Sequence, residues 1–288
     1  MGTPGRLRRQ DGRYALVDGI PFDLPVRSAH SPALMAIFTI DAERARALLP
    51  GDEVHPFRLW NRGLLVVTVI DYRDTVIGQY IEFSIAIACT HGSRPALPLL
   101  PGLFMKFFGT GQFVYDLPVS TEISVKGGKG IWGMPKHRAS LDFLIEDRAV
   151  SSQYNLDGRL AMKIEIQRPT FRLFPISMGG VNYCQFRGML MKSYVYFKGQ
   201  PYVTLLKKGA ATLTIGDHPR LKPLKDLEIG QDPLFTAFFP ETSGVLDDHF
   251  ECWFLSYEQP PQQTPEGLES VAGLGLSQDW SEPPRSKP

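Results

Sequence analysis

The fold is decided most clearly by one alternating stretch, Tyr80-Ile81-Glu82-Phe83-Ser84-Ile85-Ala86-Ile87-Ala88-Cys89. Every second residue from Ile81 to Cys89 is apolar and mostly bulky, whereas the residues between them are small or polar. Successive side chains of a β-strand point to opposite faces, so this pattern predicts a strand with one face on a hydrophobic core. The other face would either meet solvent or line a cavity, and in the second case Glu82 would be a carboxylate inside that cavity.

Strand patterns recur along most of the chain and are separated by turns. The expected strands cover residues 33–40, 64–71, 80–90, 112–115, 123–126, 139–145, 149–156, 160–167, 192–197 and 210–215. Many short strands of this kind predict a mainly antiparallel sheet that can close on itself. Residues 233–239 fit neither a helix nor a strand clearly.

Helices are expected to be few. Residues 41–50 open with Asp41, a residue type that caps helix N-termini, and stop at Pro50. This segment predicts a short amphipathic helix. A second helical piece is expected within residues 97–108, where Pro98 and Pro101 interrupt it.

The chain has 288 residues, of which 43% are hydrophobic and 21% are charged. This size and composition are sufficient for one large domain with its own core, and no repeat or linker divides the sequence. We expect an irregular N-terminal arm over residues 1–30, one domain over 31–257 and a disordered tail over 258–288. The reason is that both ends are rich in polar residues, glycine and proline.

The charge pattern argues against two classes of partner. The formal net charge is +1 and the basic residues are spread along the chain, so we expect no nucleic-acid partner. No apolar segment follows the first basic residues, and no run approaches membrane-spanning length, so we expect neither a secretory signal nor a membrane partner.

Cysteines and histidines exclude further kinds of site. The cysteines are odd in number and far apart, at Cys89, Cys184 and Cys252, which argues against a disulfide framework and fits a cytoplasmic protein. The six histidines show no metal-ligand spacing, and the sequence has no nucleotide-binding motif. We therefore expect neither a metal nor a cofactor.

One lysine stands among apolar residues, in the run Ile131-Trp132-Gly133-Met134-Pro135-Lys136-His137. A free lysine has a pKa of about 10.4, so at neutral pH roughly one amine in a few thousand is unprotonated. Burial disfavours the ammonium form and can lower a lysine pKa by several units. An apolar setting therefore makes Lys136 a candidate nucleophile. The alternative is a lysine whose aliphatic stem packs at a strand end while its amine meets water.

Several segments together resemble the acetoacetate decarboxylase family. Residues 132–139, Trp-Gly-Met-Pro-Lys-His-Arg-Ala, resemble the signature around the imine-forming lysine, which would be Lys136. The segment Tyr80-Ile81-Glu82 resembles the Tyr-x-Glu segment with the active-site carboxylate, which would be Glu82. Residues 38–50 and 211–240 match in the same order, and the resemblance covers roughly residues 33–256.

The resemblance implies a mainly β (α+β) fold, in which a curved antiparallel sheet closes into a cone-like barrel with a few short helices. It also implies a homo-oligomer that acts on a small-molecule oxo acid without a cofactor. Lys136 would form an imine with a ketone, and the protonated imine would accept electrons from the adjacent carbon–carbon bond as it breaks. Glu82 would move protons during imine formation.

Two departures from the family pattern concern the substrate. His137 stands where the family has a second lysine, and a histidine that is mostly neutral at pH 7 gives Lys136 little cationic help. In an extended segment His137 would also point away from Lys136. Met134 replaces an aromatic residue, which would make the pocket more adaptable. Candidates for contact with the substrate are His137, Arg138, Met134, Trp132 and Arg27, with Arg73 as a further candidate for its carboxylate.

Three functions fit these residues. The first is a Schiff-base lyase that decarboxylates a β-keto acid or a related oxo acid. The second is an aldolase-dehydratase that condenses pyruvate with an aldehyde through the same lysine imine. The third is a non-catalytic barrel that binds a small molecule, in which Lys136 only pairs with Glu82.

Overall fold

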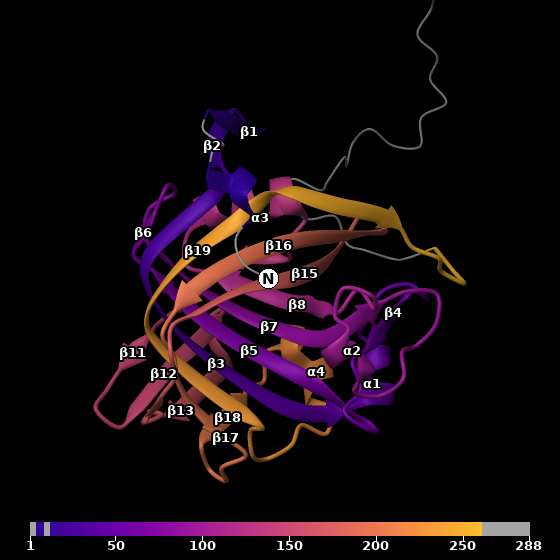
Figure 1. Ribbon diagram of the computed structural model, residues 1–288, viewed down its shortest axis with the longest axis vertical. Coiled ribbons are helices and arrows are strands. Elements are labelled where there is room, and N and C mark those ends of the chain that lie inside the picture. Colours follow the sequence, from indigo (N-terminus) through magenta and orange to yellow (C-terminus); the bar gives the residue numbers. More distant parts are fainter. Residues whose placement is uncertain (1–3, 9–11, 261–288) are drawn as a thin grey trace, which may run out of the picture.

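The computed structural model describes residues 4–8 and 12–260 of the chain. Seven of its strands close into a barrel, because the first of them, β3, also pairs with the last, β19 (Figure 1). The closed, mainly β fold that the sequence predicts is confirmed. One neighbouring pair, β8 with β15, runs parallel, so the barrel is mixed and not purely antiparallel. The barrel strands are β3 (Val26–Asp41), β5 (Arg62–Tyr72), β7 (Tyr80–His91), β8 (Gly111–Val119), β15 (Ile176–Phe186), β16 (Met189–Gly199) and β19 (Phe235–Phe254).

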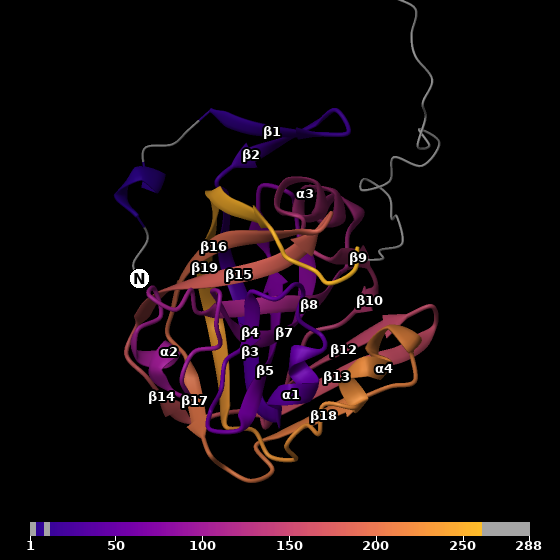
Figure 2. The ribbon, with the colours of Figure 1, turned by 90° about the vertical axis from the view of Figure 1, so that its right-hand side faces the viewer.

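A second sheet lies against the outside of the barrel. Figure 2 shows its long strands as a layer beside β5 and β7. Phe83 and Ile85 of β7 share one hydrophobic cluster with Tyr154 and Ile164 of this sheet, and all four are completely buried. The main core therefore lies between the barrel wall and the second sheet. The strands of this sheet are β10 (Ser140–Leu141), β11 (Leu144–Ile145), β12 (Ala149–Leu156), β13 (Arg159–Gln167) and β18 (Ala211–Ile215).

Strand β7 has the two faces that its alternation predicts. Phe83, Ile85 and Ile87 are completely buried in the main core. Glu82 and Ser84, on the opposite face, line a cavity inside the barrel. Of the two possibilities for the small and polar face, the structure therefore shows the cavity.

The remaining elements are short. Helix α1 begins after Asp41, whose side chain accepts a hydrogen bond from the backbone nitrogen of Arg44 at 2.8 Å, and it ends earlier than predicted, at Arg46. Within the described ranges, no helix has the length and apolar character needed to cross a bilayer. The short strands are β1 (Arg13–Val17), β2 (Ile20–Leu24), β4 (Val54–Pro56), β6 (Asp74–Thr75), β9 (Lys136–Arg138), β14 (Phe171–Arg172) and β17 (Tyr202–Leu205). The helices are α1 (Ala42–Arg46), α2 (Leu100–Leu103), α3 (Glu122–Trp132) and α4 (Lys222–Lys225), with single 3₁₀ turns η1 (Gly5–Arg8) and η2 (Pro219–Leu221).

The N-terminal segment differs from the irregular arm expected over residues 1–30. Strands β1 and β2 form an antiparallel hairpin, and β3 already begins at Val26. The hairpin turns at Asp18 and Gly19, which both have positive φ angles, of 51° and 77°. Asp-Gly is the residue pair that such tight turns prefer, so the sequence carried this signal. The tail expected from residue 258 lies almost entirely outside the described residues.

The prediction of a strand over residues 123–126 is wrong, because these residues belong to helix α3. The β-branched Ile123 and Val125 favour a strand locally, but packing decides, since Trp132 at the end of α3 is buried against the wall of the barrel. The helix ends at Gly133, which has a left-handed φ angle of 64°. Glycine adopts this conformation without the steric cost that a side chain would add.

Candidate active site

Lys136 lies on β9, which runs parallel to β8 with Lys136 opposite Leu117. The residue is 5% exposed. Its Nζ lies 2.7 Å from Oε2 of Glu82 on β7 and donates a hydrogen bond of 2.9 Å to Oγ of Ser124 on α3. The structure thus brings together the two residues that the sequence singled out and adds a hydroxyl that the sequence analysis did not identify.

Two tyrosines form an aromatic wall beside this pair. The Lys136 ammonium lies 5.4 Å from the centre of the Tyr80 ring, and Tyr80 stacks on Tyr72 with ring centres 4.6 Å apart. Burial and then the negative charge of Glu82 raise the pKa of Tyr80 well above its usual value, against the hydrogen bond with Ser124. Burial and Glu82 also raise the pKa of Tyr72. Both phenols therefore stay neutral. Their hydroxyls can donate hydrogen bonds, and they add no negative charge to that of Glu82.

Helix α3 approaches Lys136 so closely that only glycine fits at one position. A Cβ atom on Gly128 would lie 2.4 Å from Cδ and 2.7 Å from Cε of Lys136. Gly128 and Ser124 are four residues apart and so share one face of the helix. One helix face therefore both leaves room for the lysine stem and holds its amine.

We expect the Gly128→Ala variant to keep its helix and to show turnover about a hundredfold lower than the native protein. Alanine favours helix formation by about 1 kcal/mol over glycine, but its methyl group must displace the lysine, and a misplacement of about 1 Å can cost that factor. Helix content by circular dichroism and turnover would be measured together. Gly127→Ala is the matched control, since its Cβ would meet the Phe22 ring instead. Equal turnover in both variants would contradict this account.

The cavity beside Lys136 and Glu82 has two adjoining parts. The larger part, of about 150 Å³, is lined by Glu82 and by apolar residues such as Val114 and Leu117. The smaller part, of about 80 Å³, is lined by Lys136, Tyr80 and Glu82. Glu82, Tyr72, Met134 and Asn182 border both parts. A small organic molecule in this space would therefore lie between an apolar wall and the lysine.

Only one of the other residues expected to contact the substrate borders this cavity. Met134 borders both parts of it. Trp132 is buried next to Met134 in a hydrophobic cluster, and its indole nitrogen donates to the carbonyl of Asp247 at 3.2 Å. Arg27 is exposed and donates to the carbonyl of Leu7 at 2.9 Å. Residues that do not border either part of the cavity are Arg27, Arg73, Trp132, His137 and Arg138.

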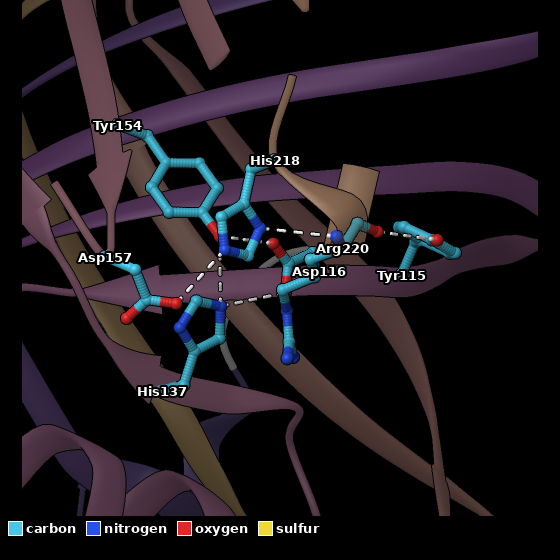
Figure 3. Close-up of polar contacts among 7 residues, drawn as sticks. All are labelled: Tyr115, Asp116, His137, Tyr154, Asp157, His218 and Arg220. Atoms are coloured by element: carbon cyan, nitrogen blue, oxygen red, sulfur yellow. Dashed lines mark hydrogen bonds and ion pairs between the residues drawn. The ribbon is translucent and has the colours of Figure 1, made fainter. Parts of the chain in front are cut away.

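His137 follows Lys136 on β9, so its side chain lies on the opposite face of the strand. It points into a separate polar cluster between the barrel and the second sheet (Figure 3). Its Nε2 lies 3.0 Å from Oδ1 of Asp116, a carboxylate that is completely buried. Nε of Arg220 donates to the same oxygen at 2.6 Å, and the Tyr154 hydroxyl donates to Oδ2 at 3.2 Å. The cluster fixes β9 from the side opposite the cavity, and so it helps to set the direction of Lys136.

The Asp116 carboxylate is charged because its partners outweigh its burial. Burial alone would raise its pKa, but the hydrogen bonds and charges of His137 and Arg220 hold it below the usual value. A group with a lowered folded-state pKa contributes stability above its unfolded pKa, and this contribution is lost as the pH falls through the folded-state pKa.

We therefore expect Asp116→Asn to lower the free energy of unfolding by about 2–3 kcal/mol at neutral pH, because it leaves the partly buried Arg220 guanidinium without its counter-charge. The deficit should stay constant above about pH 3.9, the pKa of an unfolded aspartate, and shrink below it. Urea unfolding at several pH values measures it. Asp157→Asn is the control, since that carboxylate pairs with His218 but is 79% exposed. A deficit that does not change with pH would rule out the charge as its cause.

A cysteine next to the cavity does not compete with Lys136 as a nucleophile. Cys184 is buried in the same cluster as Met134, and burial raises the pKa of its thiol to about 12. Only the thiolate is an effective nucleophile.

In the part of the chain that the structure describes, no group of three or more histidine, cysteine, aspartate or glutamate side chains is arranged to hold a metal ion.

One signal in the sequence, the spacing of Ser124 and Gly128, points to a part of this site that a strand-based interpretation misses. In a helix, Ser124 and Gly128 fall on one face, whereas in a strand over residues 123–126 this relation is lost. The buried Asp116 has no local motif around it, since its partners come from β9, β12 and η2. Only the folded arrangement identifies it.

Comparisons with solved structures agree with this fold. Acetoacetate decarboxylase from Legionella pneumophila subsp. pneumophila str. Philadelphia 1 superposes with a TM-score of 0.56 at 14% identity, over 82% of this chain and 87% of that chain. The enduracididine biosynthesis enzyme MppR complexed with pyruvate gives 0.57 at 14% identity, over 79% and 90%. An acetoacetate decarboxylase-like enzyme from Sphingomonas wittichii RW1 gives 0.52 at 15% identity, over 81% and 95%. At these identities the likeness concerns the fold alone.

Sequence comparison decides the family. A search of curated proteins returned no match. The family model described as acetoacetate decarboxylase (ADC) matches residues 14–243, which is most of the chain and includes both Glu82 and Lys136. The chain therefore belongs to the acetoacetate decarboxylase family and is a decarboxylase-like enzyme.

Proposed function

We propose that this protein is a cofactor-independent Schiff-base lyase that removes carbon dioxide from a β-keto acid or a related oxo acid. One observation carries the proposal: Nζ of Lys136, at the border of a cavity inside the barrel, lies 2.7 Å from the Glu82 carboxylate. A lysine nucleophile and a carboxylate within hydrogen-bond reach are the pair that imine formation requires.

Glu82 acts first as a base in this scheme. It accepts a proton from the Lys136 ammonium, and the free amine attacks the ketone carbon. The attacking nitrogen then gives up one proton to the carbonyl oxygen, which becomes a hydroxyl. Glu82 then returns its proton to that hydroxyl, which leaves as water, and a protonated imine remains. The hydrogen bond from Lys136 to Ser124 aims the amine, since it fixes the end of a flexible side chain.

The imine then draws electrons out of the adjacent bond. The bond between the α-carbon and the carboxylate carbon breaks, carbon dioxide leaves, and the electron pair forms an enamine with Lys136. Protonation of the α-carbon restores the imine, and water releases the ketone product and the free lysine. Among the described residues that border either part of the cavity, Lys136 is the only lysine or arginine. A substrate carboxylate there would have only the imine as its counter-charge, which favours its loss as neutral carbon dioxide.

A second candidate function uses the same lysine. The fold is shared with MppR, which is described in complex with the condensation product of pyruvate and imidazole 4-carboxaldehyde. We keep an aldolase-dehydratase activity as the alternative, in which the enamine formed from pyruvate attacks an aldehyde and water is then eliminated. The same two residues serve both reactions, so the products must distinguish them.

Product analysis is the test. The protein would be incubated with a panel of β-keto acids, including acetoacetate, and separately with pyruvate and an aldehyde. Release of carbon dioxide with one equivalent of ketone is the expected result. Condensation products from pyruvate without carbon dioxide release would favour the alternative. If the folded protein binds the compounds but yields no product in either arm, the catalytic proposal fails and the binding barrel takes its place.

A further inference from the structure

The cavity contains a pair of side-chain amides that the proposed chemistry does not use. Nε2 of Gln112 on β8 donates to Oδ1 of Asn182 on β15, at 2.8 Å. The two residues lie directly opposite each other at the parallel junction of the barrel. Both side chains border the larger part of the cavity, and Asn182 also borders the smaller part that Lys136 lines. A molecule bound to Lys136 would therefore reach this pair.

The pair has unused hydrogen-bonding capacity. The hydrogen bond to Gln112 occupies Oδ1 of Asn182, and the Asn182 amide nitrogen has two N–H donors. For these donors the described residues show no side-chain acceptor, and the carbonyl of Gln112 is likewise not used by a side chain in the described ranges. The pair can thus donate to a ligand through Asn182 and accept from it through Gln112.

The charges in the cavity limit what such a ligand can be. Among the residues that border the two parts, Lys136 is the cation and Glu82 the anion, and they pair with each other. The other polar lining residues carry hydroxyls, as Ser84 and Thr68 do, or amides. Besides the carboxylate that leaves as carbon dioxide, a further carboxylate on the ligand would lose its water without gaining a counter-charge, which is costly. The wall between these groups is apolar, with Val114 and Leu117.

We propose that Gln112 and Asn182 select an oxo substrate whose side chain is a short aliphatic segment ending in a neutral carboxamide or a similar donor–acceptor group. This inference rests on the proposed function for the position of the reacting ketone, and it names the substrate class of that site. An amide offers one carbonyl to Asn182 and one N–H group to Gln112. A site built to hydrogen-bond a polar group rejects analogues that lack the group, because its own donors are then left unpaired.

Three methyl ketones of the same shape test the proposal. Levulinamide ends in a carboxamide, levulinate in a carboxylate and methyl isoamyl ketone in an isopropyl group. Dissociation constants by calorimetry report the discrimination without requiring an imine, and borohydride trapping on the same samples reports the imine on Lys136. We expect levulinamide to bind about tenfold more tightly than either analogue, which corresponds to one additional hydrogen bond.

Matched variants assign this preference to the pair. Asn182→Leu should abolish the tenfold preference, and Asn182→Asp, which keeps the shape but removes the donors, should do so even if the leucine variant folds poorly. Asn155→Leu is the control, because Asn155 accepts from Gln153 at 3.0 Å in the second sheet, away from the cavity. Equal binding of the three ketones, no binding of any of them, or a preference that survives in both Asn182 variants would overturn the proposal. Binding with the expected preference but without a trapped adduct would uphold it while refuting the imine chemistry.

Discussion

The Lys136→Met variant is expected to lose at least about a thousandfold in turnover and to form no covalent adduct with an oxo acid. Methionine is close to lysine in length and fits an apolar site, but it has no amine to attack a carbonyl, and loss of a covalent nucleophile typically has an effect of this size. Initial rates of carbon dioxide release, compared between the variant and the native protein, would measure it.

A second lysine provides the control for this experiment. Lys126 on α3 also pairs with a carboxylate, Asp18, at 2.9 Å, but its side chain is 31% exposed and lies outside the cavity. Lys126→Met should therefore keep native turnover and native adduct formation. If Lys136→Met retained turnover while folding normally, the covalent mechanism would be excluded.

Replacement of Glu82 by glutamine should lower the turnover number by a factor of about 10²–10⁴. Glutamine keeps the shape and can still accept a hydrogen bond from Lys136, but it cannot take up a proton, and positioned general acid–base groups contribute factors in this range. The loss should appear in the turnover number more than in the Michaelis constant, because proton transfer belongs to the transition state. Steady-state kinetics on the decarboxylated substrate would separate the two constants.

A surface glutamate gives the matched comparison for Glu82. Glu165 on β13 lies 3.3 Å from Nζ of Lys163, and both side chains are more than two-fifths exposed, at 48% and 42%. Glu165→Gln should leave the kinetics unchanged. A Glu82→Gln variant with a native turnover number would show that Glu82 only neutralises Lys136, as the binding-barrel alternative requires.

Strands with a clear two-residue alternation were predictable from the sequence. The expected strand over 149–156 coincides with β12, and residues 160–167 fall within β13. Each of these strands has one face on the main core, so apolar residues recur at nearly every second position of its sequence. The same reason made the two faces of β7 predictable.

Strands β15 and β19 were not predictable in this way. Strand β15 has glycines at 179 and 180 and the polar Asn182, which borders the cavity, so its residues do not alternate regularly between an apolar and a polar face. Strand β19 runs from Phe235 to Phe254, but its register with β3 shifts near Thr242, so residues 233–239 did not continue into a recognisable pattern. Such irregularities interrupt alternation locally while the barrel keeps its pairing.

The candidate site was predictable in its chemistry and not in its environment. The apolar run around Lys136 and the alternation around Glu82 identified both residues, and the structure places them in contact. Ser124 and Gly128 lie against Lys136 from α3, and Asp116 on β8 contacts the neighbouring His137; only the fold brings these residues near. The catalytic roles of Lys136 and Glu82 remain predictions that the variants above address.

The most direct test of the central claim is borohydride trapping with acetoacetate and related oxo acids, followed by peptide mass mapping of the adduct. The account predicts one reduced adduct, located on Lys136, whose yield falls to background in Lys136→Met and is unchanged in Lys126→Met. An adduct on another residue, or none with a folded protein that binds the oxo acid, would contradict imine chemistry at Lys136.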